Sequence, residues 1–460
     1  MRQSLSIRQI QPYQNLVLIV MAMIERIIYD AKWRLLRPQA LAAWGRVMAN
    51  EHKPVEQLWA EQERAKRELV EFAVKNIKFY REKYGEAGFE PGDMAQEGWF
   101  EKLPVVTKRD LREKFGDLVN PELKARMKIS TTGGSTGEPT KVGYDGAIPE
   151  EIYSWRLQRW FGVEPWDDHA YVWRDTRSSR LAKFKNALMW WPTRHLKMDA
   201  TFITEAGMRE FLAKYNRLKP AMLQGYVGAV TQLAQFVVDQ GIKVHAPKFV
   251  WTTSAPLPEA QRRLIVRAFN APVCDQYGSC EIRWIAQQCP ECGGLHVNTE
   301  HVNIEFADEN NRPVPQGEYG KTLLTNLEDR VFPLIRYENG DRGRWLKTTC
   351  PCGRTLPIID SVKGRESESF TLPSGKTING EFLTTIFDGA PELVKGFRVV
   401  QHKDRSITVE YVPVAGDDSE VERLVKEFGG KLGGEVAVRA KPVATIAHDR
   451  GKLRFVVRER

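Results

Sequence analysis

Residues 130–140, STTGGSTGEPT, combine glycines with hydroxyl side chains in a run unsuited to the interior of a helix or strand. Glycine lets the backbone bend and approach a ligand closely. The amides and hydroxyls of such a loop can together surround phosphate oxygens. The Gly-Lys-Ser/Thr ending of a Walker loop is missing, so the loop is of another type. A flexible linker is the alternative, but Pro139 and the strand-like KVGY at 141–144 favour a phosphate loop.

Two further motifs place a carboxylate close to a glycine. In DQYGSCE, residues 275–281, the aromatic ring could stack on a base, and Glu281 could hold magnesium, which prefers hard oxygen ligands. A turn at the end of a strand explains this motif equally well. In RYENGDRG, residues 336–343, Asp341 follows Asn-Gly in a predicted tight turn. Its carboxylate could accept both hydroxyls of a ribose, although Asn-Gly also favours an ordinary hairpin.

Four of the six cysteines form two tight pairs, Cys289 with Cys292 in CPECGG and Cys350 with Cys352 in CPCGR. In a reducing compartment such pairs are more often metal ligands than disulfides. Four thiolates suit tetrahedral zinc without an open position, which predicts a structural and not a catalytic ion. The alternative is four unrelated buried cysteines.

The surrounding patterns indicate which elements position these motifs. Residues 1–90 have apolar positions at helical spacing, and from 150 to 300 helical patterns alternate with short apolar runs. This alternation predicts a parallel sheet with helices on its faces. Short strands and one amphipathic helix follow Gly364. We therefore predict an α/β protein with a helical extension (1–68), a large body with the zinc knuckle (69–364) and a small α+β lid (365–460).

Composition narrows the class of protein. Of the 460 residues, 42% are apolar and 28% are charged, which is ordinary for a globular protein. The net charge of +9 is spread along the chain, so we predict no nucleic-acid partner. The apolar run 16–24, LVLIVMAMI, lacks a cleavage site and is shorter than the roughly 20 residues that span a bilayer, so it is interpreted as a buried helix. These features predict a cytoplasmic protein without a transmembrane segment.

In their order and spacing, the motifs resemble those of the adenylate-forming (ANL) superfamily. Within it, the chain resembles the phenylacetate-CoA ligase branch and its capsule-biosynthesis CapK-like relatives. The resemblance covers roughly residues 70–460. The matching segments are KNIKFYREKY (75–84), GSTGEPTKVGY (134–144), LKPAMLQGYVGAVTQLAQF (218–236), RVFPLIRYENGDRG (330–343) and CPCGRTLPIIDSVKGRESE (350–368).

The resemblance implies an adenylate-forming body with mixed and parallel sheets, a mobile lid and a set of site residues. The loop residues Ser135, Thr136 and Gly137 would hold ATP phosphates. Tyr277 and Gly278 would flank adenine, Asp341 would bind the ribose and Glu281 would hold Mg²⁺. Arg365 would start the hinge, and Lys452 of the lid motif DRGKL would neutralise charge on the phosphates during adenylation. Without the resemblance, such a lysine is more typical of solvated surface.

The resemblance also implies a reaction. A carboxylic acid would be activated with ATP through an acyl-adenylate, with release of pyrophosphate, and the acyl group would pass to coenzyme A. Transfer to an amine, a sugar or a carrier protein is the alternative within the same enzyme class. An inactive zinc-stabilised scaffold is an alternative from another class. His296 competes for the fourth zinc position, because relatives often carry Cys…GLH before the second pair. The particular acid and the oligomeric state are left open.

Overall fold

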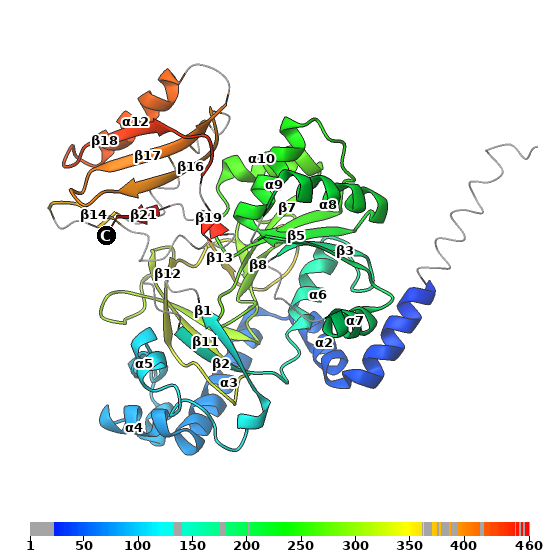
Figure 1. The fold of residues 1–460 in the computed structure, drawn as a ribbon. Coiled ribbons are helices and arrows are strands. Elements are labelled where there is room, and N and C mark those ends of the chain that lie inside the picture. The colour runs from blue at the N-terminus through cyan, green and yellow to red at the C-terminus, as the bar shows by residue number, and fades with distance from the viewer. Residues whose placement is uncertain are drawn as a thin grey trace, which may run out of the picture.

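The computed structural model describes residues 23–132, 140–173, 180–200, 203–360, 362, 370–374, 377–378, 386–387, 390, 393–414, 418–446, 448–449, 452–453 and 456–459. Figure 1 shows a large body of sheets and helices with a smaller C-terminal lobe beside it. The predicted α/β architecture is confirmed.

The N-terminal part is helical, as its apolar spacing predicts. After the helical segment 23–36, the α-helices are α2 (Pro38–Asn50), α3 (Val55–Asn76), α4 (Lys78–Glu86) and α5 (Lys108–Glu113). In α3, Leu69, Val70 and Ala73 are buried, and their spacing puts them on one face of the helix. A capping box starts α5, where Thr107 and Asp110 each bind the other's backbone amide.

An eight-stranded sheet forms the centre of the body, in the order β13-β9-β8-β7-β6-β5-β3-β4. In this sheet the neighbouring strands β7, β6, β5, β3 and β4 run parallel to one another. Strands β8, β9 and β13 pair antiparallel with their neighbours. The bounds are β3 (His169–Trp173), β4 (His195–Asp199), β5 (Met222–Tyr226), β6 (Phe249–Thr253), β7 (Val273–Tyr277), β8 (Ala286–Gln288), β9 (Leu295–Val297) and β13 (Ile358–Ile359).

Helices alternate with the parallel strands, which confirms the predicted rhythm. They are α6 (Glu151–Trp160), α7 (Arg180–Trp190), α8 (Glu205–Leu218), α9 (Val227–Asp239) and α10 (Glu259–Phe269). Every residue of β6 is buried, as expected for a central strand with both faces covered. The carboxyl ends of the parallel strands therefore share one edge, where ligands bind in open sheets of this kind.

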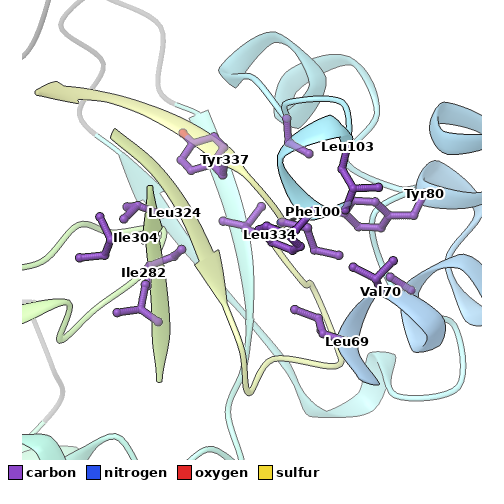
Figure 2. Packing of buried hydrophobic residues seen from close by; sticks show 14 of the residues in the cluster. Leu69, Val70, Tyr80, Phe100, Leu103, Ile282, Ile304, Leu324, Leu334 and Tyr337 are labelled. Carbon is purple, nitrogen blue, oxygen red and sulfur yellow. Dashed lines mark hydrogen bonds between the residues drawn. The ribbon is translucent and has the colours of Figure 1, made fainter. Parts of the chain in front are cut away.

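A second, antiparallel sheet pairs β10 (Val302–Ala307), β11 (Gly320–Asn326) and β12 (Tyr337–Gly343). Figure 2 shows its core, in which Leu69, Val70 and Tyr80 from the N-terminal helices pack towards Leu334 and Tyr337. The hydroxyl of Tyr80 also donates to the backbone oxygen of Pro333 at 2.8 Å. The helices thus support the segment that carries Tyr337. The predicted domain boundary after residue 68 falls inside α3.

The C-terminal lobe has its own four-stranded sheet, in the order β18-β17-β16-β21. Helix α12 (Ser419–Lys431) packs its buried residues Val421, Val425 and Phe428 into the core of this lobe. The remaining paired strands are short. The strands are β14 (Phe370–Thr371), β15 (Thr377–Ile378), β16 (Val394–Gln401), β17 (Ile407–Pro413), β18 (Val438–Pro442), β19 (His448–Asp449), β20 (Lys452–Leu453) and β21 (Val456–Arg458).

The apolar run 16–24 is only partly within the described residues. Met23 and Ile24 are helical there, but both side chains are at least half exposed. The interpretation of the run as a buried helix is therefore wrong for these two residues, because the helix turns them away from the body. Among the described residues, no helix is both long enough and apolar enough to cross a bilayer.

Candidate active site and metal centre

Tyr277 and Asp341, far apart in the sequence, meet where the two sheets of the body adjoin. Tyr277 ends the parallel strand β7, and Asp341 lies on β12 of the second sheet. The Tyr277 hydroxyl donates to Asp341 Oδ2 at 2.8 Å. The side-chain amide of Asn339 donates to the same oxygen at 2.5 Å and to the Tyr277 oxygen at 2.7 Å. Tyr277 and Asn339 thus hold the Asp341 carboxylate in one orientation.

The motif RYENGDRG does not form the tight turn that its Asn-Gly pair predicts. It is part of β12, and the pairing of β12 with β11 is irregular between Lys321 and Leu323. Gly340 has φ +83°, a backbone conformation that side chains other than glycine rarely adopt. The extra residues on β12 form a bulge, and bulges re-aim the side chains next to them. The bulge therefore places Asp341 opposite Tyr277.

Glu281 lies near this pair and is 6% exposed. Its Oε1 accepts a hydrogen bond from the Tyr337 hydroxyl at 3.0 Å. Its Oε2 is buried and has no hydrogen-bond partner among the described residues. A buried carboxylate oxygen without a partner is costly unless a ligand satisfies it. A hard cation such as Mg²⁺ fits that oxygen, because it binds carboxylates directly.

The loop between Tyr277 and Glu281 needs its glycine. A Cβ atom on Gly278 would lie 2.8 Å from Gln276 Nε2 and 3.2 Å from the backbone nitrogen of Trp284. Both contacts are tighter than ordinary van der Waals contacts, so a larger residue here would require Gln276 or the neighbouring backbone to shift. The Ser279 hydroxyl accepts from the amide of Glu281 at 3.2 Å and fixes the turn that presents the carboxylate.

The predicted phosphate loop connects two paired strands. Strand β1 (Met127–Thr132) pairs with β2 (Thr140–Asp145), and Thr132 faces Thr140 at the base of the connection. Ser135, Thr136 and Gly137 lie outside the described residues. The Arg283 guanidinium stacks on the ring of Tyr144, 3.8 Å from its centroid. Strand β2 therefore borders the loop that carries Glu281.

A short hairpin of the C-terminal lobe reaches the body. In it, β19 pairs with β20, and Asp449 faces Lys452. Strand β20 contacts α9, whose first residue follows Tyr226 at the carboxyl edge of the sheet. Figure 1 shows β19 between the lobe and the body. The backbone of Lys452 is thus close to the body, whereas Arg365 lies outside the described residues.

The two cysteine pairs converge with a histidine. One ligand atom each from Cys289, His296, Cys350 and Cys352 lies within 4.8 Å of the other three. The sulfurs of Cys289 and Cys350 are 3.5 Å apart, and Cys352 Sγ is 3.6 Å from His296 Nε2. Cys292 is outside this set of four, although its thiol hydrogen-bonds that of Cys289 and thereby raises the pKa of Cys289. In this set His296 takes the place that the prediction gave to Cys292, as in the alternative that named His296 as the competing fourth ligand.

His296 has the surroundings of a metal ligand. It is fully buried, and its Nδ1 lies 3.1 Å from the backbone oxygen of Leu356. A ring N–H that donates to a carbonyl leaves the other nitrogen free to bind a metal, which is the usual arrangement for ligating histidines. Cysteine sulfur with histidine nitrogen is a zinc donor set. Cys292 Sγ instead accepts from the amide of Gly294 at 3.3 Å.

Asn339 and Tyr337 are site residues that the sequence reasoning missed. Both belong to RYENGDRG, and the buried positions of β12 alternate with half-buried ones through Tyr337, Asn339 and Asp341. This period of two is the usual pattern of a strand. Reading the motif as a strand instead of a turn would have put all three side chains on one face.

Comparisons with known proteins show which enzymes the whole chain is similar to. No family model matches the chain. Phenylacetate-coenzyme A ligase of Escherichia coli K12 is 26% identical over 333 residues, 68% of this chain and 72% of that protein. The Thermus thermophilus phenylacetate-coenzyme A ligase is 23% identical over 83% of this chain and 85% of that protein. The resemblance to the phenylacetate-CoA ligase branch is confirmed.

A solved structure confirms the adenylate-forming fold. 2-Hydroxyisobutyryl-CoA ligase in its postadenylation state superposes with a TM-score of 0.74 at 22% identity, over 89% of this chain and 91% of that one. The same enzyme in its thioesterification state gives a TM-score of 0.60. By this measure, the overall arrangement of this chain is nearer to the postadenylation structure.

Proposed function

We propose that the chain is an ATP-dependent acid ligase, which activates a carboxylic acid as an acyl-adenylate, releases pyrophosphate and transfers the acyl group to coenzyme A. The observation that carries this proposal is the meeting of Tyr277, Asn339 and Asp341 beside the buried Glu281. This group of side chains combines a nucleoside-binding surface with a cation ligand. The similarity to phenylacetate-CoA ligases supports coenzyme A as the acceptor.

In this proposal the adenosine of ATP lies against Tyr277 and Gly278. The Asp341 carboxylate accepts the two ribose hydroxyls, since Oδ2 is held by Tyr277 and Asn339 and the carboxylate cannot rotate away. Gly278 follows Tyr277 directly, and a base can approach a glycine backbone closely. Positioning of this kind supplies much of the catalysis in phosphoryl chemistry.

Glu281 and Lys452 act on the phosphates in this proposal. The free Oε2 of Glu281 would bind Mg²⁺, which when bound neutralises phosphate charge. Lys452 would bring a positive charge from the lobe, and the loop residues Ser135, Thr136 and Gly137 would surround the phosphates. The carboxylate of the acid then attacks the α-phosphorus, the bond to the bridging oxygen breaks, and pyrophosphate leaves.

Transfer to coenzyme A requires access to the acyl-adenylate after pyrophosphate has left. We propose the division into an extension (1–68), a body (69–364) and a lid (365–460) that turns about a hinge starting at Arg365. The contact of β20 with α9 suits the adenylation arrangement, because it brings the Lys452 hairpin to the body. A cytoplasmic location is part of the same proposal.

The test is pyrophosphate release from ATP with a panel of aryl, fatty and amino acids, with and without coenzyme A. We expect release with one class of acid, followed by formation of its thioester when coenzyme A is present. Adenylate formation without any thioester would assign the acceptor to an amine, a sugar or a carrier protein. Absence of ATP binding by calorimetry would refute the proposed reaction altogether and leave a scaffold.

We also propose that the cysteine–histidine centre holds a structural zinc ion. Its residues join the turn after β8 and strand β9 to the segment before β13. This segment also binds the N-terminal helices, where Arg354 contacts Glu51 at 3.1 Å. Zinc would therefore tie the central sheet to the extension, at a place separate from Asp341.

Substitution of single ligands tests the zinc centre. We expect Cys350→Ser and His296→Ala to lower the bound zinc, measured by metal analysis, and the melting temperature together. Cys292→Ser is the matched comparison, because Cys292 is outside the set of four and we expect it to retain most of the zinc. Full zinc in His296→Ala with loss of zinc in Cys292→Ser would restore the four-cysteine assignment.

A further inference from the structure

The helical segment 23–36 has an apolar stripe that faces solvent. Ile24, Ile27 and Leu35 are 50%, 63% and 82% exposed. Their spacing of three and eight residues puts them on one face of the helix. On the other side, Tyr29 and Trp33 are buried against the body. The segment thus uses its aromatic residues for packing and leaves aliphatic ones uncovered.

Helix α7 repeats this pattern next to the segment. Leu181, Phe184 and Leu188, at helical spacing, are each more than 60% exposed. Lys32 of the segment donates to the backbone oxygen of Met189 at 2.6 Å, so the two helices touch. Figure 1 shows α7 and the blue N-terminal helix together, on the opposite side of the molecule from the C-terminal lobe.

These two stripes together form what we call the apolar shoulder, defined by Ile24, Ile27, Leu35, Leu181, Phe184 and Leu188. Single exposed apolar side chains are ordinary on protein surfaces. Two adjacent helices that both expose an apolar stripe are unusual, and such a surface marks a site of interaction.

The charge of this region favours one kind of partner. Residues 180–197, RLAKFKNALMWWPTRHLK, contain five basic residues and no acidic residue, and residues 23–36 contain three basic and two acidic ones, so both halves carry net positive charge. Lys185, on the helix between Leu181 and Leu188, is exposed. A helix with basic residues beside apolar ones is typical of helices that lie in the headgroup region of a membrane. Trp191, which is 54% exposed at the end of α7, has the amphipathic ring that is enriched at this depth.

A second copy of the chain is a less suitable partner for the apolar shoulder than an anionic surface. Two-fold association would place the same surface on both sides of the contact. Exposed Lys185, on the helix between Leu181 and Leu188, would then be brought to the contact from both copies, and like charges in an apolar contact repel. An anionic partner removes that repulsion.

We propose that the apolar shoulder docks the protein on the surface of a bilayer that contains anionic lipids. The apolar side chains enter the acyl boundary, and the basic residues lie among the headgroups. The docking is peripheral and leaves the nucleotide-binding side chains on another part of the body.

Sedimentation of the full chain with vesicles tests this proposal. We expect the protein to pellet with phosphatidylcholine vesicles that contain phosphatidylglycerol, less with phosphatidylcholine alone, and less at high salt. Phe184→Glu with Leu188→Glu, and separately Ile27→Glu with Leu35→Glu, should each lower the bound fraction by roughly tenfold. Val266→Glu is the matched control, since Val266 is an exposed apolar residue of α10, outside the shoulder. Unchanged melting temperatures would show that the variants remain folded.

Several outcomes would overturn the proposal. They are the absence of sedimentation with anionic vesicles, equal sedimentation with neutral ones, and full binding by both double variants. A dimer in the absence of lipid that dissociates on Phe184→Glu would assign the shoulder to a second copy. Vesicle binding seen only after residues 1–22 are removed would assign it to that segment of the same chain.

Discussion

Replacement of Asp341 by asparagine tests the nucleoside site most directly. The change keeps the size and shape of the side chain and removes its negative charge. Tyr277 and Asn339 both donate to Oδ2. In the variant, these two donors should orient the amide so that its oxygen occupies that place. The amide nitrogen, which cannot accept, then replaces the carboxylate oxygen that we assign to the ribose.

The magnitude follows from the bonds that are lost. A hydrogen bond to a charged group contributes about 1.5–3 kcal/mol, which is more than a bond between neutral groups. The two ribose hydroxyls share one carboxylate, so we expect a total loss of about 2–3 kcal/mol in binding free energy. This corresponds to a roughly 30- to 150-fold rise in the Kd for ATP. The fold should change little, because Tyr277 and Asn339 keep an acceptor.

The assay is calorimetric titration with ATP and magnesium, together with thermal melting of the same samples. Asp360→Asn is the matched control. Asp360 also accepts a tyrosine hydroxyl, from Tyr319 at 2.6 Å, but it follows β13 of the eight-stranded sheet, whereas Asp341 lies on β12 of the other sheet. We expect this control to bind ATP as the parent chain does.

Two results would refute the reasoning. A Kd for ATP that changes less than about threefold in Asp341→Asn, or roughly 0.6 kcal/mol, would remove Asp341 from the ribose site. An equal loss of affinity in Asp360→Asn would show that the effect comes from general loosening of the fold. In either case Tyr277 and Asn339 would hold Asp341 only for structural reasons.

Three further predictions concern magnesium, the lobe and acid stability. Tyr337→Phe removes the hydrogen bond that holds Glu281 Oε1, so we expect the magnesium concentration for half-maximal pyrophosphate release to rise by roughly tenfold, with Tyr319→Phe as the unaffected control. Lys452→Ala should slow adenylate formation by roughly 10²–10³-fold with an unchanged melting temperature, and an unchanged rate would refute its assigned part. Burial lowers the pKa of His169 from 6.5 to about 3, so the stability that its neutral form contributes is complete above pH 6.5 and is lost as pH falls towards 3. Below pH 6.5 we therefore expect His169→Gln to lose less stability than the parent chain, by about 1.4 kcal/mol per pH unit, measured by urea unfolding.

The order of elements could be predicted because it depends on local patterns. The alternation that predicted a parallel sheet between residues 150 and 300 corresponds to strands β3 to β7 and helices α6 to α10. The alternative explanation of DQYGSCE, a turn at the end of a strand, agrees with the structure, in which β7 ends at Tyr277 and Gly278 follows. Side chains that repeat along one element reveal that element without any knowledge of its neighbours.

The motif around Asp341 was harder to predict because two rules compete there. Asn-Gly favours a turn, while the alternation of buried residues favours a strand. Residues 337–343 form a strand because they pair with β11, and Gly340 adopts a positive φ where this pairing is irregular. Only the partner strand determines which rule prevails, and the partner lies outside the motif.

From residue types and order alone, the chain carries a loop fit for phosphates, a tyrosine and carboxylates fit for a nucleotide, and thiols fit for zinc. These properties depend on the chemistry of single side chains and of short segments. The tertiary structure alone decided that Tyr277, Asn339 and Asp341 share their hydrogen bonds, that His296 joins the cysteines, and that the aliphatic residues of 23–36 face solvent. Such contacts join residues distant in sequence, so they depend on how whole sheets and helices pack, which no local pattern specifies.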